Sequence, residues 1–152
     1  MDKRISVLFV CVHNSARSQM AEAFLRSMAG DHMDVESAGL EPGALNPIVV
    51  AAMRESGIDI SAHRTKSVDE FLRTGRSFTY VITVCDETQA ERCPVFPGRA
   101  TRLHWSFDDP SSFAGTPEER LRRTCAVRDQ IRAAVQNFYS TILRDNATGN
   151  IQ

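Results

Sequence analysis

The sequence lacks the marks of several specialised classes of protein. It has no excess of positive charge, since 18 lysines and arginines oppose 19 aspartates and glutamates, for a formal net charge of −1. A global basic field is therefore absent, so we expect no nucleic-acid partner and a local site for any anion. The apolar run at residues 5–10 is too short for a signal-peptide core or a membrane span, so we expect a cytoplasmic protein with no membrane partner.

Cysteine is also scarce. The chain has only four such residues, at Cys11, Cys85, Cys93 and Cys125. Four cysteines do not make a disulfide framework, so catalytic, redox or metal roles are favoured. With 152 residues, the chain is long enough to bury about two thirds of its unfolded surface without covalent staples. Since no repeat or linker interrupts it, we expect one catalytic domain over residues 1–145 and a frayed C-terminal tail at 146–152.

Segments typical of strands and helices alternate along the chain. Strands are expected at residues 5–10, 35–38, 79–84 and 101–104, and helices at residues 18–29, 47–55, 67–73 and 116–143. This alternation predicts right-handed crossovers, a parallel sheet and a doubly wound α/β sandwich. Ligands bind beyond the carboxyl ends of the strands in such sheets, which is where Cys11, Cys85 and Asp109 fall.

The stretch from Cys11 to Arg17 combines features that suit a tetrahedral oxyanion. Backbone N–H groups of such a loop form an anion nest, and the helix that follows adds its partial positive charge. Arg17 supplies a planar fork for two oxygens, and the positive surroundings favour the thiolate form of Cys11. Ser18 can donate a hydrogen bond to that thiolate. The predicted substrate-binding residues are Val12, His13, Asn14, Ser15, Ala16, Arg17 and Ser18.

One pattern in the chain resembles a known family. Residues 10–23 are similar to the signature of the low-molecular-weight protein tyrosine phosphatase superfamily, and more narrowly to that of the thioredoxin-coupled arsenate reductases; they read Val-Cys-Val-His-Asn-Ser-Ala-Arg-Ser-Gln-Met-Ala-Glu-Ala. The resemblance continues through residues 36–39, 46–47, 57–61 and 104–110. It implies a three-layer α/β sandwich, a four-stranded parallel sheet with helices on both faces, in agreement with the alternating pattern.

The resemblance implies a role for each remaining polar residue of the site. Asp109, just before Pro110, is expected to be the general acid that protonates the leaving oxygen, although an aspartate before proline also commonly caps a turn. Cys85 is expected to attack Cys11 after arsenate has bound, and Cys93 to resolve the resulting disulfide. The implied partners are arsenate or a phosphate-like oxyanion, and thioredoxin or another thiol system as external reductant.

Two other functions stay open at this point. A phosphatase would hydrolyse phosphotyrosine or a small phosphate ester through a phosphocysteine, and an oxyanion sensor would bind without turnover. Phosphatases of this family usually carry aromatic residues around the mouth of the site, but residues 40–45 and 111–112 have none, which favours a reductase for a small anion. The Cys85–Cys93 spacing is one residue longer than the commonest reductase pattern, so the sequence leaves the reductant open.

Some relatives bind a potassium ion near the loop. Asn14, Glu22 and Ser37 match part of that site, with Asp69 a candidate fourth ligand. Equally, these side chains can support the loop by hydrogen bonds alone, and no tightly bound cofactor is expected. We expect His13 to face solvent, and Cys125 to pack in the core on the apolar face of the last helix.

Overall fold

A computed structural model of the chain describes residues 4–84 and 98–148. Its centre is a sheet in which every neighbouring pair of strands is parallel, in the order β2-β1-β3-β4. The strands are β1 Ile5–Cys11, β2 Met33–Gly39, β3 Tyr80–Thr83 and β4 Thr101–His104. The predicted four-stranded parallel sheet is confirmed. β1 is a central strand, which explains its unbroken apolar run, since Val7 to Val10 are all fully buried.

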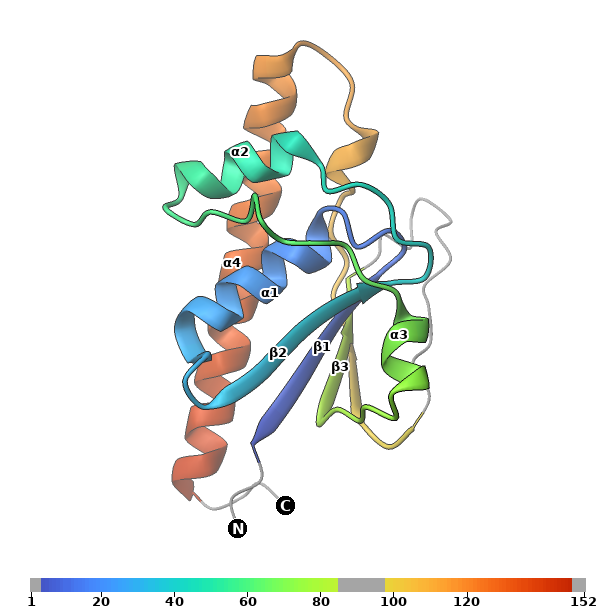
Figure 1. The fold of residues 1–152 in the computed structure, drawn as a ribbon. Helices are drawn as coiled ribbons and strands as arrows, with labels where there is room; N and C mark the ends of the chain where they lie inside the picture. The colour runs from blue at the N-terminus through green and yellow to red at the C-terminus, as the bar shows by residue number, and fades with distance from the viewer. Residues whose placement is uncertain (1–3, 85–97, 149–152) are drawn as a thin grey trace.

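Helices cover both faces of the sheet (Figure 1). They are α1 Arg17–Ala29, α2 Pro47–Glu55, α3 Val68–Arg73 and α4 Pro117–Thr148, with a short 3₁₀ helix, η2, at Pro110–Ser112. Val7 and Phe9 of β1 pack in a cluster with side chains of α1, α2 and α4. Leu8 and Val10 pack on the opposite face with α3. This arrangement confirms the predicted three-layer sandwich.

The last helix differs from the prediction at its C-terminal end. α4 runs to Thr148 rather than ending near residue 143, so residues 146–148, expected in the frayed tail, are helical. The physical reason is that no glycine or proline interrupts the chain between Glu118 and Thr148. Residues 149–152 lie outside the described residues. Of the helices in the described part of the chain, none has the length and apolar content that a membrane span requires.

Cys125 does not lie in the core as expected. Thr124 occupies the buried position of this turn of α4, and Cys125 is half-buried at the contact with α2. Its thiol lies 3.7 Å from Glu55 Oε1 and 3.4 Å from Arg128 Nη1. Burial raises the pKa of the Cys125 thiol, which Arg128 opposes and Glu55 reinforces. This cysteine is therefore a poor nucleophile at neutral pH.

Candidate active site

The loop between β1 and α1 turns its carbonyl groups away from its centre. Backbone N–H groups of residues 40–46 donate at 2.8–3.2 Å to the carbonyl oxygens of Cys11, Val12, His13 and Ser15. The Asn14 carbonyl accepts from the Gln19 amide at 3.2 Å. Because N–H and C=O of a trans peptide point in opposite directions, the N–H groups of residues 12–16 face the loop centre. A concave array of this kind binds anions.

Asn14 holds the loop in shape through an uncommon backbone conformation. Its φ of 55° lies in the left-handed region, which asparagine tolerates better than most residues. The side chain is fully buried, and its amide nitrogen donates to Ser18 Oγ at 2.8 Å and to Ser37 Oγ at 2.9 Å. Its amide oxygen accepts from the backbone N–H of Lys66 at 2.8 Å. One side chain therefore ties the loop to α1, β2 and the segment before α3.

Gly39 allows the end of β2 to approach the loop closely. A Cβ at this position would lie 2.7 Å from the Asn14 backbone nitrogen and 2.8 Å from the Val12 carbonyl oxygen. Any larger residue would therefore push the two segments apart. Cys11 and Gly39 are also partners in the β1–β2 register, so the close approach occurs directly beside the nucleophile candidate.

Cys11 lies at the carboxyl end of β1 with two donors at its sulfur. The residue is 3% exposed. The Asn14 backbone N–H donates to Sγ at 3.1 Å, and Ser18 Oγ lies 2.9 Å from it. Since Ser18 Oγ already accepts from Asn14 Nδ2, its own proton can point to Cys11. Two donors and the N-terminus of α1 together stabilise negative charge on this sulfur.

Arg17 connects the loop to the segment after β4. Its Nη1 donates to the Phe107 carbonyl at 3.0 Å, and its Nη2 lies 3.6 Å from Asp109 Oδ2. The Asp109 Oδ1 atom accepts from the Ser111 backbone N–H at 3.0 Å. Asp109 therefore caps η2, as the alternative interpretation of this residue expected, and it also faces the Arg17 guanidinium. A thiol, an arginine fork and a carboxyl group converge on one anion loop.

Most of the chain matches the model of a known family. A profile described as "Low molecular weight phosphotyrosine protein phosphatase" matches residues 6–148. The chain belongs to the low molecular weight phosphotyrosine protein phosphatase family.

Several proteins that are similar to this chain are named arsenate reductases. The chain is 43% identical over 141 residues to an arsenate reductase of Shouchella clausii, covering 93% of this chain and 99% of the relative. Its fold is similar to that of a solved arsenate reductase in the oxidized state, with a TM-score of 0.73, 29% identity, and coverage of 90% and 98% of the two chains. A thioredoxin-dependent arsenate reductase of Corynebacterium glutamicum has a TM-score of 0.66 and 29% identity, covering 95% of this chain and 64% of that one.

The structure brings together only some of the predicted site residues of this phosphatase-family chain. Cys11, Arg17 and Asp109 lie around the loop, as described above. His13 is exposed, and its Nδ1 lies 3.0 Å from the Glu41 carbonyl oxygen, which agrees with a solvent-facing side chain. Cys85 and Cys93 lie outside the described residues.

The two segments expected at the mouth of the site, residues 40–45 and 111–112, contain no aromatic residue. The segment at 40–46 has none, and Phe113, which follows η2, is buried in the core. The Arg123 guanidinium stacks on the Phe113 ring at 4.2 Å from its centroid, which covers it further. The aromatic grip that a phosphotyrosine ring would use is therefore missing from this part of the mouth.

Sequence reasoning missed Gln19 and His63, which support the loop from below. The Gln19 amide nitrogen faces three acceptors, namely both oxygens of Asn14 and the Arg64 carbonyl. This orients its oxygen toward His63 Nδ1, 3.1 Å away, so Nδ1 must carry a proton. Burial lowers the pKa of His63, an effect that Glu22 opposes and Lys66 reinforces. We infer a neutral imidazole at pH 7.

The lowered pKa of His63 predicts a pH-dependent stability. The pKa of His63 is lower in the folded protein than its ordinary value of 6.5, which applies in the unfolded chain. The folded protein therefore binds a proton at His63 less readily. The free energy of unfolding should therefore fall as the pH drops below that value, and its His63 contribution should be constant above it. His63→Asn keeps a donor near the Nδ1 position but does not titrate. Urea unfolding between about pH 5 and pH 8 should give a flatter profile for the variant. Equal profiles would contradict the neutral imidazole.

The residues proposed for potassium do not fit a metal ion. Asn14 Oδ1 accepts from the Lys66 N–H and from Gln19, and Glu22 Oε1 accepts from Ser37 Oγ. The Lys66 ammonium lies 3.0 Å from the same Glu22 oxygen, so a cation of the protein already neutralises this carboxylate. Asp69, the candidate fourth ligand, is 69% exposed and pairs with Arg73 on α3. The expectation for Asp69 is wrong because the position faces solvent.

Proposed function

We propose that the protein is an arsenate reductase that uses Cys11 as its nucleophile. The observation that carries this proposal is the anion loop, which begins at Cys11 and ends at Arg17 and whose Asn14 N–H donates to the Cys11 sulfur at 3.1 Å. A nest of this kind recognises a tetrahedral oxyanion by shape and charge. The names of the similar proteins supply the identity of the oxyanion.

The first step forms a covalent adduct. The Cys11 thiolate attacks the arsenic atom of arsenate, a sulfur–arsenic bond forms, and one oxygen leaves as water. Asp109 supplies the proton to that oxygen, and Arg17 holds two of the remaining oxygens. Asp109 Oδ2 lies 3.6 Å from Arg17 Nη2, which supports a proton donor and an oxyanion donor that act on the same substrate.

The second step transfers the electrons. We infer that the Cys85 thiolate attacks the Cys11 sulfur, so a disulfide forms and the arsenic–sulfur bond breaks with its electron pair on arsenic. Arsenic is thereby reduced and leaves as arsenite. Cys93 then attacks Cys85 and frees Cys11, and an external dithiol reduces the Cys85–Cys93 disulfide. The path of the described chain supports this order, because the Val84 backbone N–H donates to the Val10 carbonyl at 2.9 Å, beside Cys11.

The external dithiol that closes the cycle is proposed to be thioredoxin. A thioredoxin-dependent arsenate reductase is among the similar structures. The relay needs free thiols at three positions, which a reducing compartment such as the cytoplasm maintains. The test compares arsenite formation with thioredoxin and its reductase against the same assay with glutathione and glutaredoxin. Hydrolysis of an aryl phosphate that does not depend on Cys85 would instead identify a phosphatase.

The relay predicts a different covalent product for each cysteine variant. After one equivalent of arsenate without reductant, Cys93→Ser should accumulate a Cys11–Cys85 disulfide, since only the resolving step is missing. Cys85→Ser should form neither this disulfide nor stoichiometric arsenite. Mass spectrometry of proteolytic fragments distinguishes these products.

Cys125→Ser is the matched control for the relay. Its thiol contacts Glu55 and Arg128 rather than the anion loop, so this variant should give the wild-type disulfide map. Unchanged disulfides in both relay variants, together with continued arsenite formation, would contradict the three-cysteine relay. The protein would then be a one-cysteine reductase that uses an external thiol.

A further inference from the structure

A buried carboxylate is linked to the anion loop through a single residue, Ser37, which bonds both Glu22 and Asn14. Glu22 projects from α1, and its side chain is only 4% exposed. One oxygen, Oε1, accepts from Ser37 Oγ and from the Lys66 ammonium at 3.0 Å, while Oε2 lies 3.3 Å from Arg26 Nη2. A carboxylate this deeply buried requires a cationic partner.

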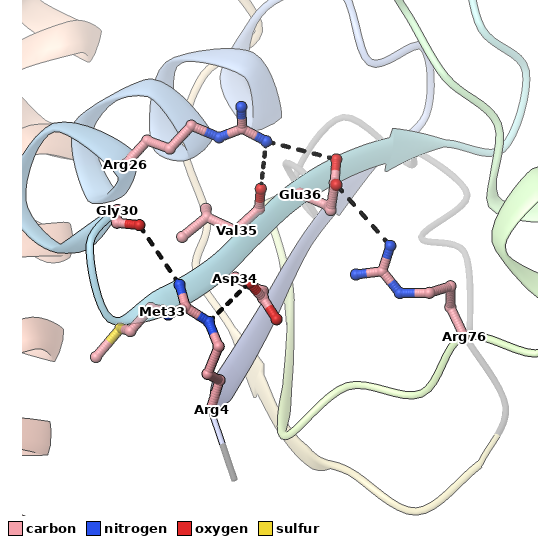
Figure 2. A pocket seen from close by; sticks show the side chains of 8 residues that line it. All are labelled: Arg4, Arg26, Gly30, Met33, Asp34, Val35, Glu36 and Arg76. Atoms are coloured by element: carbon pink, nitrogen blue, oxygen red, sulfur yellow. Dashed lines mark hydrogen bonds and ion pairs between the residues drawn. The ribbon is translucent and has the colours of Figure 1, made fainter. Parts of the chain in front are cut away.

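Lys66 is the buried member of the charge cluster around Glu22. Its side chain is 11% exposed, and its ammonium also lies 3.2 Å from Glu36 Oε1. Figure 2 shows Glu36 on β2 with Arg26 and Arg76 on its two sides. Those two arginines are 48% and 38% exposed, so solvent screens their charges far more than that of Lys66.

Hydrogen bonds lead from this cluster to the nucleophile without a gap. Ser37 Oγ donates to Glu22 Oε1. Ser37 then accepts from the Asn14 amide, whose second N–H goes to Ser18. The Ser18 proton is thereby left for the Cys11 sulfur, 2.9 Å away. The Asn14 amide nitrogen, which can only donate, sets the direction of its bonds to Ser37 and Ser18, and Glu22 accepts the remaining Ser37 proton at the far end of the chain.

Lys66 also contacts the loop through its backbone. Its N–H donates to Asn14 Oδ1 at 2.8 Å, and its carbonyl accepts from the Gly39 N–H at 2.9 Å. The ammonium and the backbone of one residue therefore act on the same structure from two sides. Lys66 therefore both neutralises Glu22 and holds Asn14 and Gly39 in position through its backbone.

We propose that Lys66 is a positioning residue whose ammonium is a built-in monovalent cation linked to the anion loop. By pairing with Glu22 the ammonium anchors the far end of the hydrogen-bond chain that leads to Cys11, and it makes the protein independent of potassium. Removing the ammonium leaves Glu22 and Ser37 oxygens around a space in which a potassium ion can replace it. Only the turnover measurement in the test below depends on the proposed function, because melting temperature and phosphate binding can be measured without it.

The test compares Lys66→Met with the wild type in potassium chloride and in choline chloride at equal ionic strength. In choline, the variant should unfold roughly 6–12 °C lower and turn over arsenate roughly tenfold to a hundredfold more slowly. Potassium should restore most of both losses and should also tighten phosphate binding measured by calorimetry. The wild type should change less than twofold between the two salts.

Two further variants make the result specific. Arg76→Met removes a more exposed cation from Glu36, at 3.9 Å, and should neither slow turnover nor create a response to potassium. Lys66→Arg keeps the charge and should stay independent of potassium. Either of two results would overturn the proposal. One is a wild type that potassium stimulates more than threefold, and the other is a Lys66→Met protein whose melting temperature and phosphate binding do not change with potassium. Phosphate binding and melting decide this even if arsenate proves not to be the substrate.

Discussion

Replacing Cys11 with serine is expected to lower arsenate turnover below about a hundredth of the wild-type rate. A serine hydroxyl is a far poorer nucleophile than a thiolate at neutral pH. The surrounding loop should keep its shape, because the Asn14 N–H and Ser18 that contact the sulfur can equally contact a hydroxyl oxygen. Arsenite formation with an excess of reductant measures the loss, and calorimetric binding of phosphate to the variant shows that the loop is intact.

The Cys125→Ser variant is the control for this experiment too. Its thiol is replaced by the same hydroxyl, but at the α2–α4 contact. It should keep wild-type turnover. A Cys11→Ser protein that binds phosphate normally and retains more than a hundredth of the activity would show that another group attacks the substrate. Loss of phosphate binding together with activity would show instead that the substitution disturbs the loop.

The sequence was sufficient to predict the local geometry of the anion loop, which depends on neighbours along the chain. Cys11, Asn14, Arg17 and Ser18 lie within one strand–loop–helix unit, so spacing alone places them around a common centre. The left-handed geometry of Asn14 follows from its residue type and its place in the loop. The parallel sheet follows equally well, because β1 is buried on both faces and its apolar run shows this directly.

The supporting contacts could not be predicted, because they join residues far apart in sequence. Lys66 contacts Glu22, which is 44 residues away in the sequence. His63 contacts Gln19 over the same separation of 44 residues. In the sequence, Lys66 is an ordinary lysine in a polar segment, and only the sheet and α1 reveal that its ammonium is buried against a carboxylate. The same limit explains why Asp69 was expected near the loop, since its carboxylate faces solvent on α3 instead.

For α4, the sequence predicted burial correctly only for residues at the centre of its apolar face. Val127, Ile131, Val135 and Ile142 of α4 are buried as their spacing predicts. Cys125 lies at the edge of that face, where a small rotation decides between core and surface. Thr124 is fully buried at this turn instead, although its hydropathy alone would predict an exposed position.

Arg17→Lys is expected to cost roughly 2–4 kcal/mol of transition-state stabilisation, the loss typical of removing a preorganised oxyanion donor. The Arg17 guanidinium contacts the Phe107 carbonyl and Asp109 with its two terminal nitrogens, so the segment after β4 fixes its plane relative to the loop. A lysine ammonium keeps the charge, but it is a single point on a flexible stem. It cannot hold those two groups and two oxygens of the oxyanion in one plane.

The loss at Arg17 should appear in kcat/KM as a decrease of about 30-fold to 1,000-fold, which corresponds to that free energy. Because the ammonium still attracts an anion, phosphate binding measured by calorimetry should weaken less than kcat/KM falls. Arg76→Lys, which makes the same exchange at a half-exposed arginine that pairs with Glu36 of β2, should leave both quantities unchanged. An Arg17→Lys rate within threefold of the wild type would mean that charge alone serves at this position. The oxyanion would then be oriented by the loop N–H groups of residues 12–16, without the guanidinium fork.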